Sequence, residues 1–527
     1  LANTLDPKAE PLLLKILKDS NKPFSTRKVS LDGLAKTKSG AMELIKAAEE
    51  KQLDAELNFF AGNALRNTRW KSISDRANQL FPALLSIFIV VLIQDLGFNP
   101  LLYGIIAFVP RFIDAITDPL MGFISDNTKS KWGKRRQYVF FGAILTGIAF
   151  ILSWQLYAEN GQTFNFWYFL IFNLIFYLGI TIFGIPFVAM GYEMSDDFHE
   201  RTKIMAVSQF IGQFAWVLAP WIWIIIYDPN IFVDPASGTR VLSVVFGVLC
   251  TLLAIVPAIF IKSKSTLNDD YLVPLTRENI GKSLLNIIYI FKDAWKNIPF
   301  RKLCIATFLV FNSFQTIAAF SFFIIVHYLF LGDASAASPW PTLHGSVGAI
   351  ITTFVVIPIV SKMAQRFGKK ETFIISQSIS VIGYILFWFL FIPGKPYMFL
   401  YALPFFSFGI GGLFTLMMSM TADTCDYEEL NNGLPRKEGS FGAIYWWMVK
   451  LGTALAGLLS GLIMYYVGFS ADALTQPEGA LTGLRIAYSS IPIIGTLIAI
   501  YVMRDYEINE DRAAKIRTQL QQRKGVI

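Results

Sequence analysis

The sequence predicts an all-α membrane protein with twelve membrane-spanning helices arranged in two halves of six. Hydrophobic residues make up 54% of the 527 positions and charged residues only 16%, a balance too apolar for a series of soluble domains. Apolar runs of about 20 residues, the length that crosses a bilayer core, recur from Leu80 to Met503. Lys and Arg gather in alternate connections, as they do in the cytoplasmic loops of membrane proteins.

The expected spans follow one another with short connections. In the first half they are residues 80–96, 101–125, 138–157, 165–192, 204–227 and 240–262. In the second half they are residues 303–331, 344–362, 371–392, 396–420, 441–467 and 483–503. We therefore divide the chain into an N-terminal extension (1–74), a first half (75–262), a connector (263–302), a second half (303–503) and a tail (504–527).

The positions of the basic residues predict the orientation in the membrane. Five Lys or Arg residues lie within 129–136 and four within 362–370, whereas residues 157–167 and 331–346 contain none. By the positive-inside rule both termini are cytoplasmic, and we expect a multi-pass protein of the bacterial inner membrane. The net charge of +8 is explained by these loops and the tail, so nucleic acid is not an expected partner.

The segments outside the spans are polar. Residues 38–66 have helical periodicity and mixed charge, which suits a cytoplasmic extension, and no cleavable signal peptide is expected. The connector is too charged to cross, and its middle has the pattern of an amphipathic helix lying on the cytoplasmic surface. Because the three Cys and the three His are scattered, we expect no disulfide framework, resident metal or cofactor.

A short internal repeat supports the division into halves. The stretch after the second span, "SKWGKRRQYVFFGAI", and the stretch after the eighth, "QRFGKKETFIISQSI", share an aromatic-Gly-Lys-basic core. Matching loops in two six-span halves are typical of transporters whose halves are related by a pseudo-twofold axis.

The second span carries ionisable residues in an apolar setting. Asp114 and Asp118 are four residues apart, so a helix places both carboxylates on one face, with Arg111 one turn earlier. Two adjacent carboxylates repel and favour a bound proton or cation, which predicts a site for H⁺ or Na⁺. The structural alternative is that they snorkel from a helix end or simply pair with Arg111.

Lys450 is a candidate partner for these acids. It lies about one third of the way into the eleventh expected span, where an unpaired ammonium would be destabilising. Pairing with Asp114 or Asp118 across the halves would connect cation occupancy with closure of the halves. A snorkelling lysine is the alternative.

Three segments of the sequence resemble those of a known transporter family. The stretches "DAITDPLMGFISDNTKSKWGKRRQ", "GIPFVAMGYEMSDDFHERTKI" and "MTADTCDYEELNNGLPRKEGSFGAIYWWMVKLG" together closely resemble the glycoside-pentoside-hexuronide:cation symporters of the major facilitator superfamily. The resemblance covers residues 75–505 and leaves out the N-terminal extension. It implies the major facilitator fold and a secondary transporter rather than an enzyme.

The resemblance also implies roles for individual residues. The cation site and its coupling residues fall on Asp114, Asp118, Thr117, Thr181, Lys450 and Arg111. The sugar-contacting positions differ from those of the melibiose permease, since acidic positions of that protein fall on Gln79 and Gly184, and an arginine falls on Gln209. Galactoside recognition is therefore in doubt, and the loss of acidic groups leaves room for an anionic solute such as a hexuronide.

Amides and aromatics supply the candidates for binding the solute, because amides hydrogen-bond hydroxyls and aromatic rings stack on sugar faces. These candidates are Gln79, Tyr177, Gln209, Gln213, Trp216 and Trp446. Each aromatic could instead pack or contact lipid. Glycines at helical spacing in the eleventh span, including Gly442, Gly457 and Gly461, are expected to allow close helix approach.

Charged residues in the cytoplasmic loops are candidates for gating by salt bridges that form and break between conformations. They are Lys134, Arg135, Arg201, Asp423, Asp426 and Arg436. An ordinary solvated charged surface is the alternative.

These patterns favour symport of a sugar-class solute with Na⁺ or H⁺ by alternating access, with a monomer as the working unit and membrane lipid around it. Cation-coupled transport of a lysolipid or another non-sugar solute is the alternative, because lysophospholipid symporters resemble the same family. The sequence contains no P-loop, no HExxH motif and no nucleophile beside an activating base, which argues against a hydrolytic motor and an intramembrane enzyme.

Overall fold

The computed structural model describes residues 10–19, 22–23, 26–27, 30–31, 34, 79–192, 214–261, 265–267, 274–432, 438–470, 476–477 and 479–523. Every regular element within these residues is helical. The first, α1 (Glu10–Lys18), buries Leu13 and Leu17, and the Arg27 Nε donates to the Leu17 carbonyl at 2.9 Å. The expected helical stretch at 38–66 lies outside the described residues.

Ten helices in the described part of the chain are long and apolar enough to cross a membrane. The first half contributes α5 (Pro100–Asp126), α6 (Arg136–Ser153), α7 (Gln162–Tyr192) and α10 (Pro235–Phe260). The second half contributes α12 (Ile298–Ile324) continued by η4 (Ile325–Leu329), α14 (Pro339–Ile350) continued by η5 (Ile351–Val356) and α15 (Ile357–Phe367), α16 (Lys369–Leu390), α17 (Leu403–Asn432) preceded by η6 (Pro396–Ala402), α18 (Glu438–Tyr466) and α19 (Ala480–Arg504). Each corresponds to one expected span.

The remaining two expected spans, 80–96 and 204–227, correspond to shorter apolar helices, Gln79–Gln94 and Phe214–Ile226. The second of these ends in η3 (Ala219–Trp221) and α9 (Ile222–Ile226). Residues 204–213 lie outside the described part. Six expected boundaries need correction. α6 ends at Ser153 rather than at residue 157, and α17 continues to Asn432, well past residue 420. The other four differ by five residues: α10, α12 and α14 begin earlier, at Pro235, Ile298 and Pro339, and α15 ends later, at Phe367.

The internal repeat is confirmed in the backbone. Gly133 and Gly368 occupy equivalent places in its two copies, and they have φ values of 81° and 83°. Residues other than glycine rarely adopt this backbone conformation, so both copies need glycine for the same turn. In the second copy Gly368 also ends α15 and begins α16.

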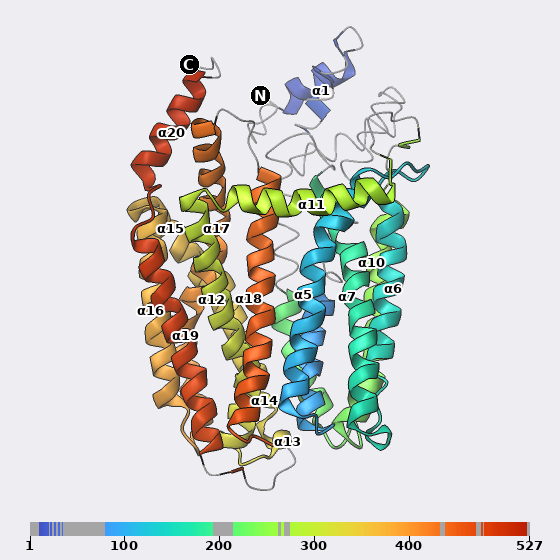
Figure 1. The fold of residues 1–527 in the computed structure, drawn as a ribbon, viewed down its shortest axis with the longest axis vertical. Coiled ribbons are helices and arrows are strands. Elements are labelled where there is room, and N and C mark those ends of the chain that lie inside the picture. The colour runs from blue at the N-terminus through green and yellow to red at the C-terminus, as the bar shows by residue number, and fades with distance from the viewer. Residues whose placement is uncertain are drawn as a thin grey trace.

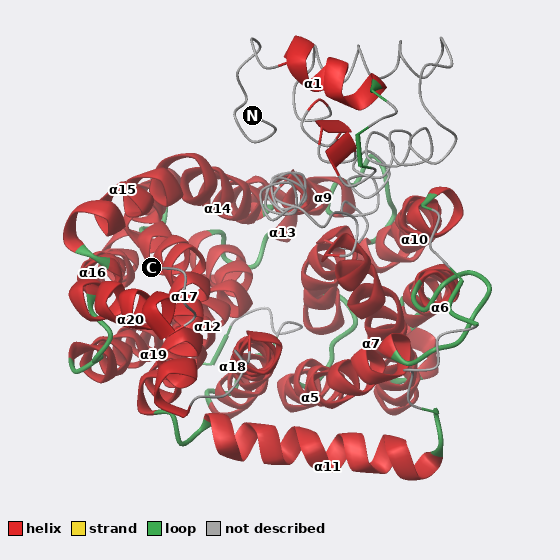
Figure 2. Cartoon of the chain, turned by 90° about the horizontal axis from the view of Figure 1, so that it is seen from above, coloured by secondary structure: helices red, strands yellow, loops and turns green. Residues whose placement is uncertain are grey.

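Seen from above, the long helices form two groups (Figure 2). In the first group α6 packs against α7 and α10, and α7 also packs against α5. In the second group α12 packs against α17, α18 and α19, while α16 lies between α17 and α19. The groups meet where α5 packs against α18 and where η3 and α9 pack against α14.

The helices α1, α20 (Glu510–Arg523) and α11 (Arg277–Ala294) lie at one end of the molecule, and α13 (Ala334–Ala337) lies at the other (Figure 1). We call these the α11 end and the α13 end. α11 lies across the long helices and packs against both α5 and α18. The expected amphipathic helix of the connector is therefore present and touches both groups.

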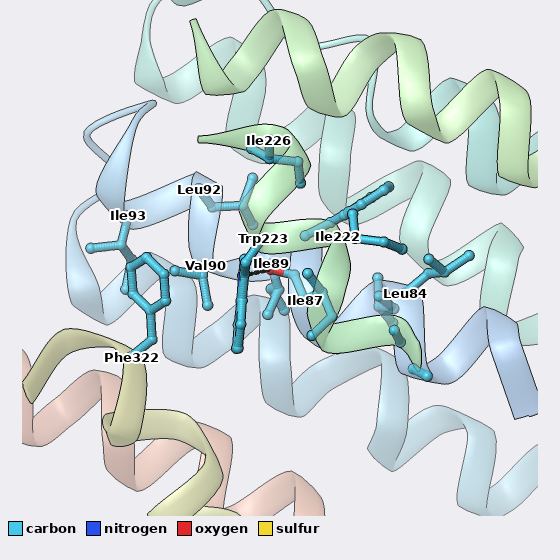
Figure 3. Packing of buried hydrophobic residues seen from close by; sticks show 14 of the residues in the cluster. Leu84, Ile87, Ile89, Val90, Leu92, Ile93, Ile222, Trp223, Ile226 and Phe322 are labelled. Carbon is cyan, nitrogen blue, oxygen red and sulfur yellow. Dashed lines mark hydrogen bonds between the residues drawn. The ribbon is translucent and has the colours of Figure 1, made fainter. Parts of the chain in front are cut away.

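The α13 end is closed by contacts between the two groups. Figure 3 shows the helix Gln79–Gln94 packed against α9, with Phe322 of the second group facing Trp223 of the first. The ring centroids of Trp223 and Phe322 are 5.3 Å apart, and His327 Nε2 lies 2.9 Å from Gln94 Oε1. Thr342 also donates to the carbonyl of Pro220 at 2.8 Å.

Glycines bring α5 and α18 into backbone contact near the same end. A Cβ at Gly461 would lie 2.4 Å from the Pro100 carbonyl oxygen, and a Cβ at Gly457 would lie 2.5 Å from the Cβ of Ala107. The expectation of close approach is confirmed for both glycines. It is wrong for Gly442 within the described part of the chain, where nothing lies within 4 Å of a Cβ built there.

Candidate functional site

The predicted acid pair lies inside α5, which has a well-defined start. Asn99 accepts a hydrogen bond from the Leu101 N–H at 2.9 Å, and Pro100 occupies the first position, where its missing N–H has no cost. At a rise of about 1.5 Å per residue, Asp114 lies roughly 21 Å into the helix. This depth places the carboxylates well inside the span and rules out snorkelling from its end.

Lys450 of α18 pairs with both carboxylates. Its Nζ lies 2.6 Å from Asp114 Oδ2 and also hydrogen-bonds Asp118 Oδ2. The side chains of Asp114, Asp118 and Lys450 are 6%, 18% and 29% exposed, so the lysine has the most accessible side chain of the three. Since α5 and α18 belong to different groups, this charge cluster joins the two groups of helices.

The other carboxylate oxygens meet at Thr181 of α7. Its Oγ1 lies 2.7 Å from Asp114 Oδ1 and 2.9 Å from Asp118 Oδ1. Thr117 is adjacent, with its Oγ1 3.3 Å from that of Thr181 and 3.2 Å from the Asp114 carbonyl. The predicted residues of the cation site are thus brought together from three helices.

The Thr181 hydroxyl lies within hydrogen-bonding distance of two carboxylate oxygens but has a single hydrogen to donate. One hydroxyl carries one hydrogen and can donate it to only one acceptor at a time. The other carboxylate oxygen beside Thr181 is then left to accept a proton or to contact a cation. The oxygens of Asp114, Asp118 and Thr181 are the hard ligands that both ions prefer.

Arg111 lies one turn before Asp114 but does not join the charge cluster by a hydrogen bond. Its Nε donates to the Tyr177 hydroxyl on α7 at 3.0 Å. Tyr177, a solute candidate, therefore also orients the arginine.

Two further solute candidates come together. Trp216 Nε1 donates to Gln79 Oε1 at 3.2 Å, which places an aromatic ring beside an amide from another helix of the first group. Trp216 is 39% exposed and Trp446, on α18, is 45% exposed. Gln209 and Gln213 lie outside the described residues.

Two of the six gating candidates, Arg135 and Asp423, form ion pairs within their own group. Arg135 pairs with Asp126 in the first group, and Lys369 pairs with Asp423 in the second. Lys134 lies just before α6 and Asp426 lies on α17. Arg201 and Arg436 lie outside the described residues.

Sequence reasoning did not identify the pairs that close the α13 end. Gln94 with His327 and Trp223 with Phe322 are ordinary residues of apolar helices, and no local pattern marks them. The partners of each pair lie far apart in the chain, where helical periodicity carries no information about contacts. Covariation between positions in an alignment of homologues would be needed to find them.

Among the described residues no group of three or more His, Cys, Asp or Glu is placed to hold a metal ion.

The fold and the intramembrane charge cluster define a multi-pass membrane transporter. The model of the family described as MFS/sugar transport protein matches residues 72–510. The chain belongs to this family, and the resemblance to the glycoside-pentoside-hexuronide:cation symporters is confirmed. It is a transporter and not an enzyme.

Several named relatives are also similar to this chain over most of its length. The chain is 25% identical over 468 residues to a glucuronide carrier protein homolog of Escherichia coli, covering 86% of this chain and 95% of that protein. It is 23% identical over 429 residues to a putative glycoside/cation symporter of E. coli, covering 80% and 87%. It is 26% identical over 444 residues to a putative sulfoquinovose importer of E. coli, covering 82% and 88%.

A solved structure with the same fold is that of a bacterial homolog of the human lysosomal transporter Spinster in an inward-facing conformation. The TM-score is 0.57 at 13% identity, covering 86% of this chain and 97% of that one. This likeness shows the major facilitator fold alone.

Proposed function

We propose that this protein is a secondary transporter that couples inward movement of H⁺ or Na⁺ to uptake of a sugar-class solute. The observation that carries the proposal is the contact of Lys450 with both Asp114 and Asp118 across the two groups of helices. The names of the relatives, a glycoside/cation symporter among them, support the same solute class and the use of a cation.

The coupling step follows from charge. A cation arriving at the aspartates competes with the Lys450 ammonium for the same carboxylate oxygens. Once the cation replaces that ammonium, the only described ion pairs that join α5 and α18 are lost. The groups can then rock about the site, which is the motion of alternating access.

In this proposal the solute binds at candidates that hydrogen-bond one another or Arg111. The Gln79 and Trp216 pair offers an amide and a ring edge in one place, as recognition of sugar hydroxyls and sugar faces requires. Tyr177, which contacts Arg111, links the solute candidates to the helix that carries the acid pair.

The proposed topology is that of twelve spans. The short helices Gln79–Gln94 and Phe214–Ile226 complete the ten longer ones, giving halves at 75–262 and 303–503 joined by the connector 263–302. The extension 1–74 and the tail 504–527 are cytoplasmic in this proposal, which puts the α11 end on the cytoplasmic side of the bacterial inner membrane. Because one chain supplies every residue of the charge cluster, we propose a working monomer in contact with membrane lipid.

The test is uptake by purified protein in liposomes with an imposed Na⁺ or H⁺ gradient, each run separately against a panel of glycosides, pentosides and hexuronates. We expect one gradient to drive accumulation of a saccharide and Asp118→Asn to abolish that accumulation. Accumulation that is unchanged in Asp118→Asn would contradict the coupling site. A panel that is inert while a lysolipid is moved would contradict the solute class.

A further inference from the structure

Arg111 has unused hydrogen-bonding capacity inside the membrane-spanning region. Its Nε donates to Tyr177, and it makes no other hydrogen bond and no ion pair with any residue that the structure describes. The side chain is partly exposed. A guanidinium has five N–H donors in a planar fork, so the outer edge formed by Nη1 and Nη2 is available to a ligand.

An arginine within another membrane-spanning helix, Arg485, has its donors satisfied by the protein. In α19, Arg485 donates from Nη1 to the Tyr328 hydroxyl at 2.9 Å and from Nη2 to the Trp388 carbonyl at 2.8 Å. Its Cζ also lies 4.1 Å from the centroid of the Tyr328 ring. A charged group in this region is costly without partners, and Arg485 shows how the fold supplies them. Arg111 differs from Arg485 in keeping the outer edge of its guanidinium open.

The net charge around Arg111 indicates the sign of the missing partner. Asp114 and Asp118 carry two negative charges, and Lys450 and Arg111 carry two positive charges, so the cluster is neutral when empty. A monovalent cation bound at the aspartates adds one positive charge in a region of low dielectric constant. A ligand with one negative charge restores neutrality, and it makes each partner bind more tightly in the presence of the other.

We propose that the outer edge of Arg111 binds an anionic group of the solute, a carboxylate or a sulfonate carried on a sugar. This inference rests on the proposed sugar symport and specifies its solute class as acidic sugars. Both anions accept two parallel hydrogen bonds from a guanidinium, which an ammonium cannot donate in the same geometry. The attraction between the bound cation and the bound anion then supplies the coupling.

The test compares solutes that differ in one group. Methyl β-glucuronide, methyl β-glucoside and methyl β-sulfoquinovoside share the pyranose ring, and C5 of the ring carries a carboxylate, a hydroxymethyl and a sulfomethyl group respectively. Binding to purified wild type is measured by calorimetry with saturating Na⁺ at pH 8 and without Na⁺ at pH 5.5. We expect at least one acidic sugar to bind ten-fold or more tightly than the glucoside, and the better of the two identifies the anion.

Variants assign the preference to Arg111. Arg111→Gln is expected to lower the affinity for the acidic sugar ten-fold or more, so that it equals that for the glucoside. Arg111→Lys keeps a charge without the planar fork and should give an intermediate affinity, which also checks that a change at this position is tolerated. Arg485→Gln is the matched arginine control and should keep the wild-type preference.

The outcomes separate the two proposals. If wild type binds and accumulates the glucoside as well as the acidic sugars, or if Arg111→Gln keeps the preference, the inference about Arg111 is overturned while sugar symport stands. If no sugar of the set or of the wider saccharide panel binds under either condition, both are overturned.

Discussion

Helices α5 and α18 touch at two places that differ in chemistry. Near the α13 end the contact is made by backbone and small residues, with Gly461 against Pro100 and Gly104. Farther along the two helices the contact consists of ion pairs, which Lys450 forms with Asp114 and Asp118. The same pair of helices is therefore held by shape at one level and by electrostatics at the other.

The two contacts respond to different changes. Close packing of glycines has no group that an ion or a solute can replace, so its strength is fixed by geometry. The charged contact can be exchanged, because a cation competes directly with the ammonium. We expect the glycine contact to act as a pivot and the charged contact to act as the ion-sensitive part.

The largest effect is expected from removing the positive charge with Lys450→Gln. The two carboxylates then repel each other without a partner, and breaking a buried ion pair in this way costs about 3–5 kcal/mol. Protonation of a carboxyl relieves the repulsion, so the variant should melt well below wild type at pH 8 and regain stability as the pH falls. Thermal melting in detergent across pH 5 to 9 measures this.

The control for this prediction is the double variant Lys450→Gln with Asp118→Asn. It removes one charge of each sign and should melt nearly independently of pH. A Lys450→Gln protein that is as stable as wild type at pH 8 would show that the ammonium does not neutralise the aspartates.

The next effect in size is expected from Gly461→Ala. The added Cβ would lie 2.4 Å from the Pro100 carbonyl, so the helices must separate, at a cost of about 1–3 kcal/mol. Transport should fall several-fold while stabilisation of the protein by the coupling ion is retained. Gly442→Ala, on the same helix with nothing within 4 Å, should behave as wild type. Equal transport by the two variants would argue against a pivot at Gly461.

A smaller effect is expected from Thr181→Val, which keeps the shape of the side chain and removes the hydroxyl shared by both aspartates. Loss of one hydrogen bond to a charged group corresponds to about 1.5–3 kcal/mol. The concentration of ion that gives half-maximal uptake should rise about ten-fold or more, with the maximal rate less affected. Thr453→Val is the control, because the one hydrogen bond of the Thr453 hydroxyl to a described residue goes to the Val449 carbonyl of its own helix. An unchanged ion dependence in Thr181→Val would remove Thr181 from the site.

The smallest effect is expected at the hydrogen bond between Gln94 and His327. A double-mutant cycle with Gln94→Leu and His327→Leu should give a coupling energy of about 1 kcal/mol in thermal stability, the usual value for a neutral hydrogen bond. A coupling energy near zero would show that the closure of the α13 end depends on the aromatic contacts instead.

Much of the charged contact could be predicted from the sequence. The four-residue spacing of Asp114 and Asp118 determines that they share a helix face, and the cost of an isolated ammonium in a span implied a partner for Lys450. The first argument needs only the periodicity of a helix. The second needs only the knowledge that the span lies in an apolar membrane. A sequence provides both. The resemblance to a family then added Thr181, which no local pattern marks.

The closure at the α13 end could not be predicted in the same way. Trp223 and Phe322 are common in apolar helices, and their contact depends on how the two groups pack. Glycine spacing in α18 predicted close approach but did not tell which glycines meet a neighbour, and Gly442 shows this. The open edge of Arg111 also needed coordinates, because a sequence does not show which donors remain unused.

Helix α11 packs against one helix of each group and, at about 1.5 Å per residue, its 18 residues make a rod of roughly 27 Å. A rod fixed to two bodies must slide over at least one of them when they turn. Leu285, Ile288 and Tyr289 form an exposed apolar stripe along it, which in the proposed topology faces the inner surface of the bilayer. Each transport cycle then moves this stripe through the lipid headgroups, so the viscosity and lateral pressure of the membrane contribute friction to the turnover rate.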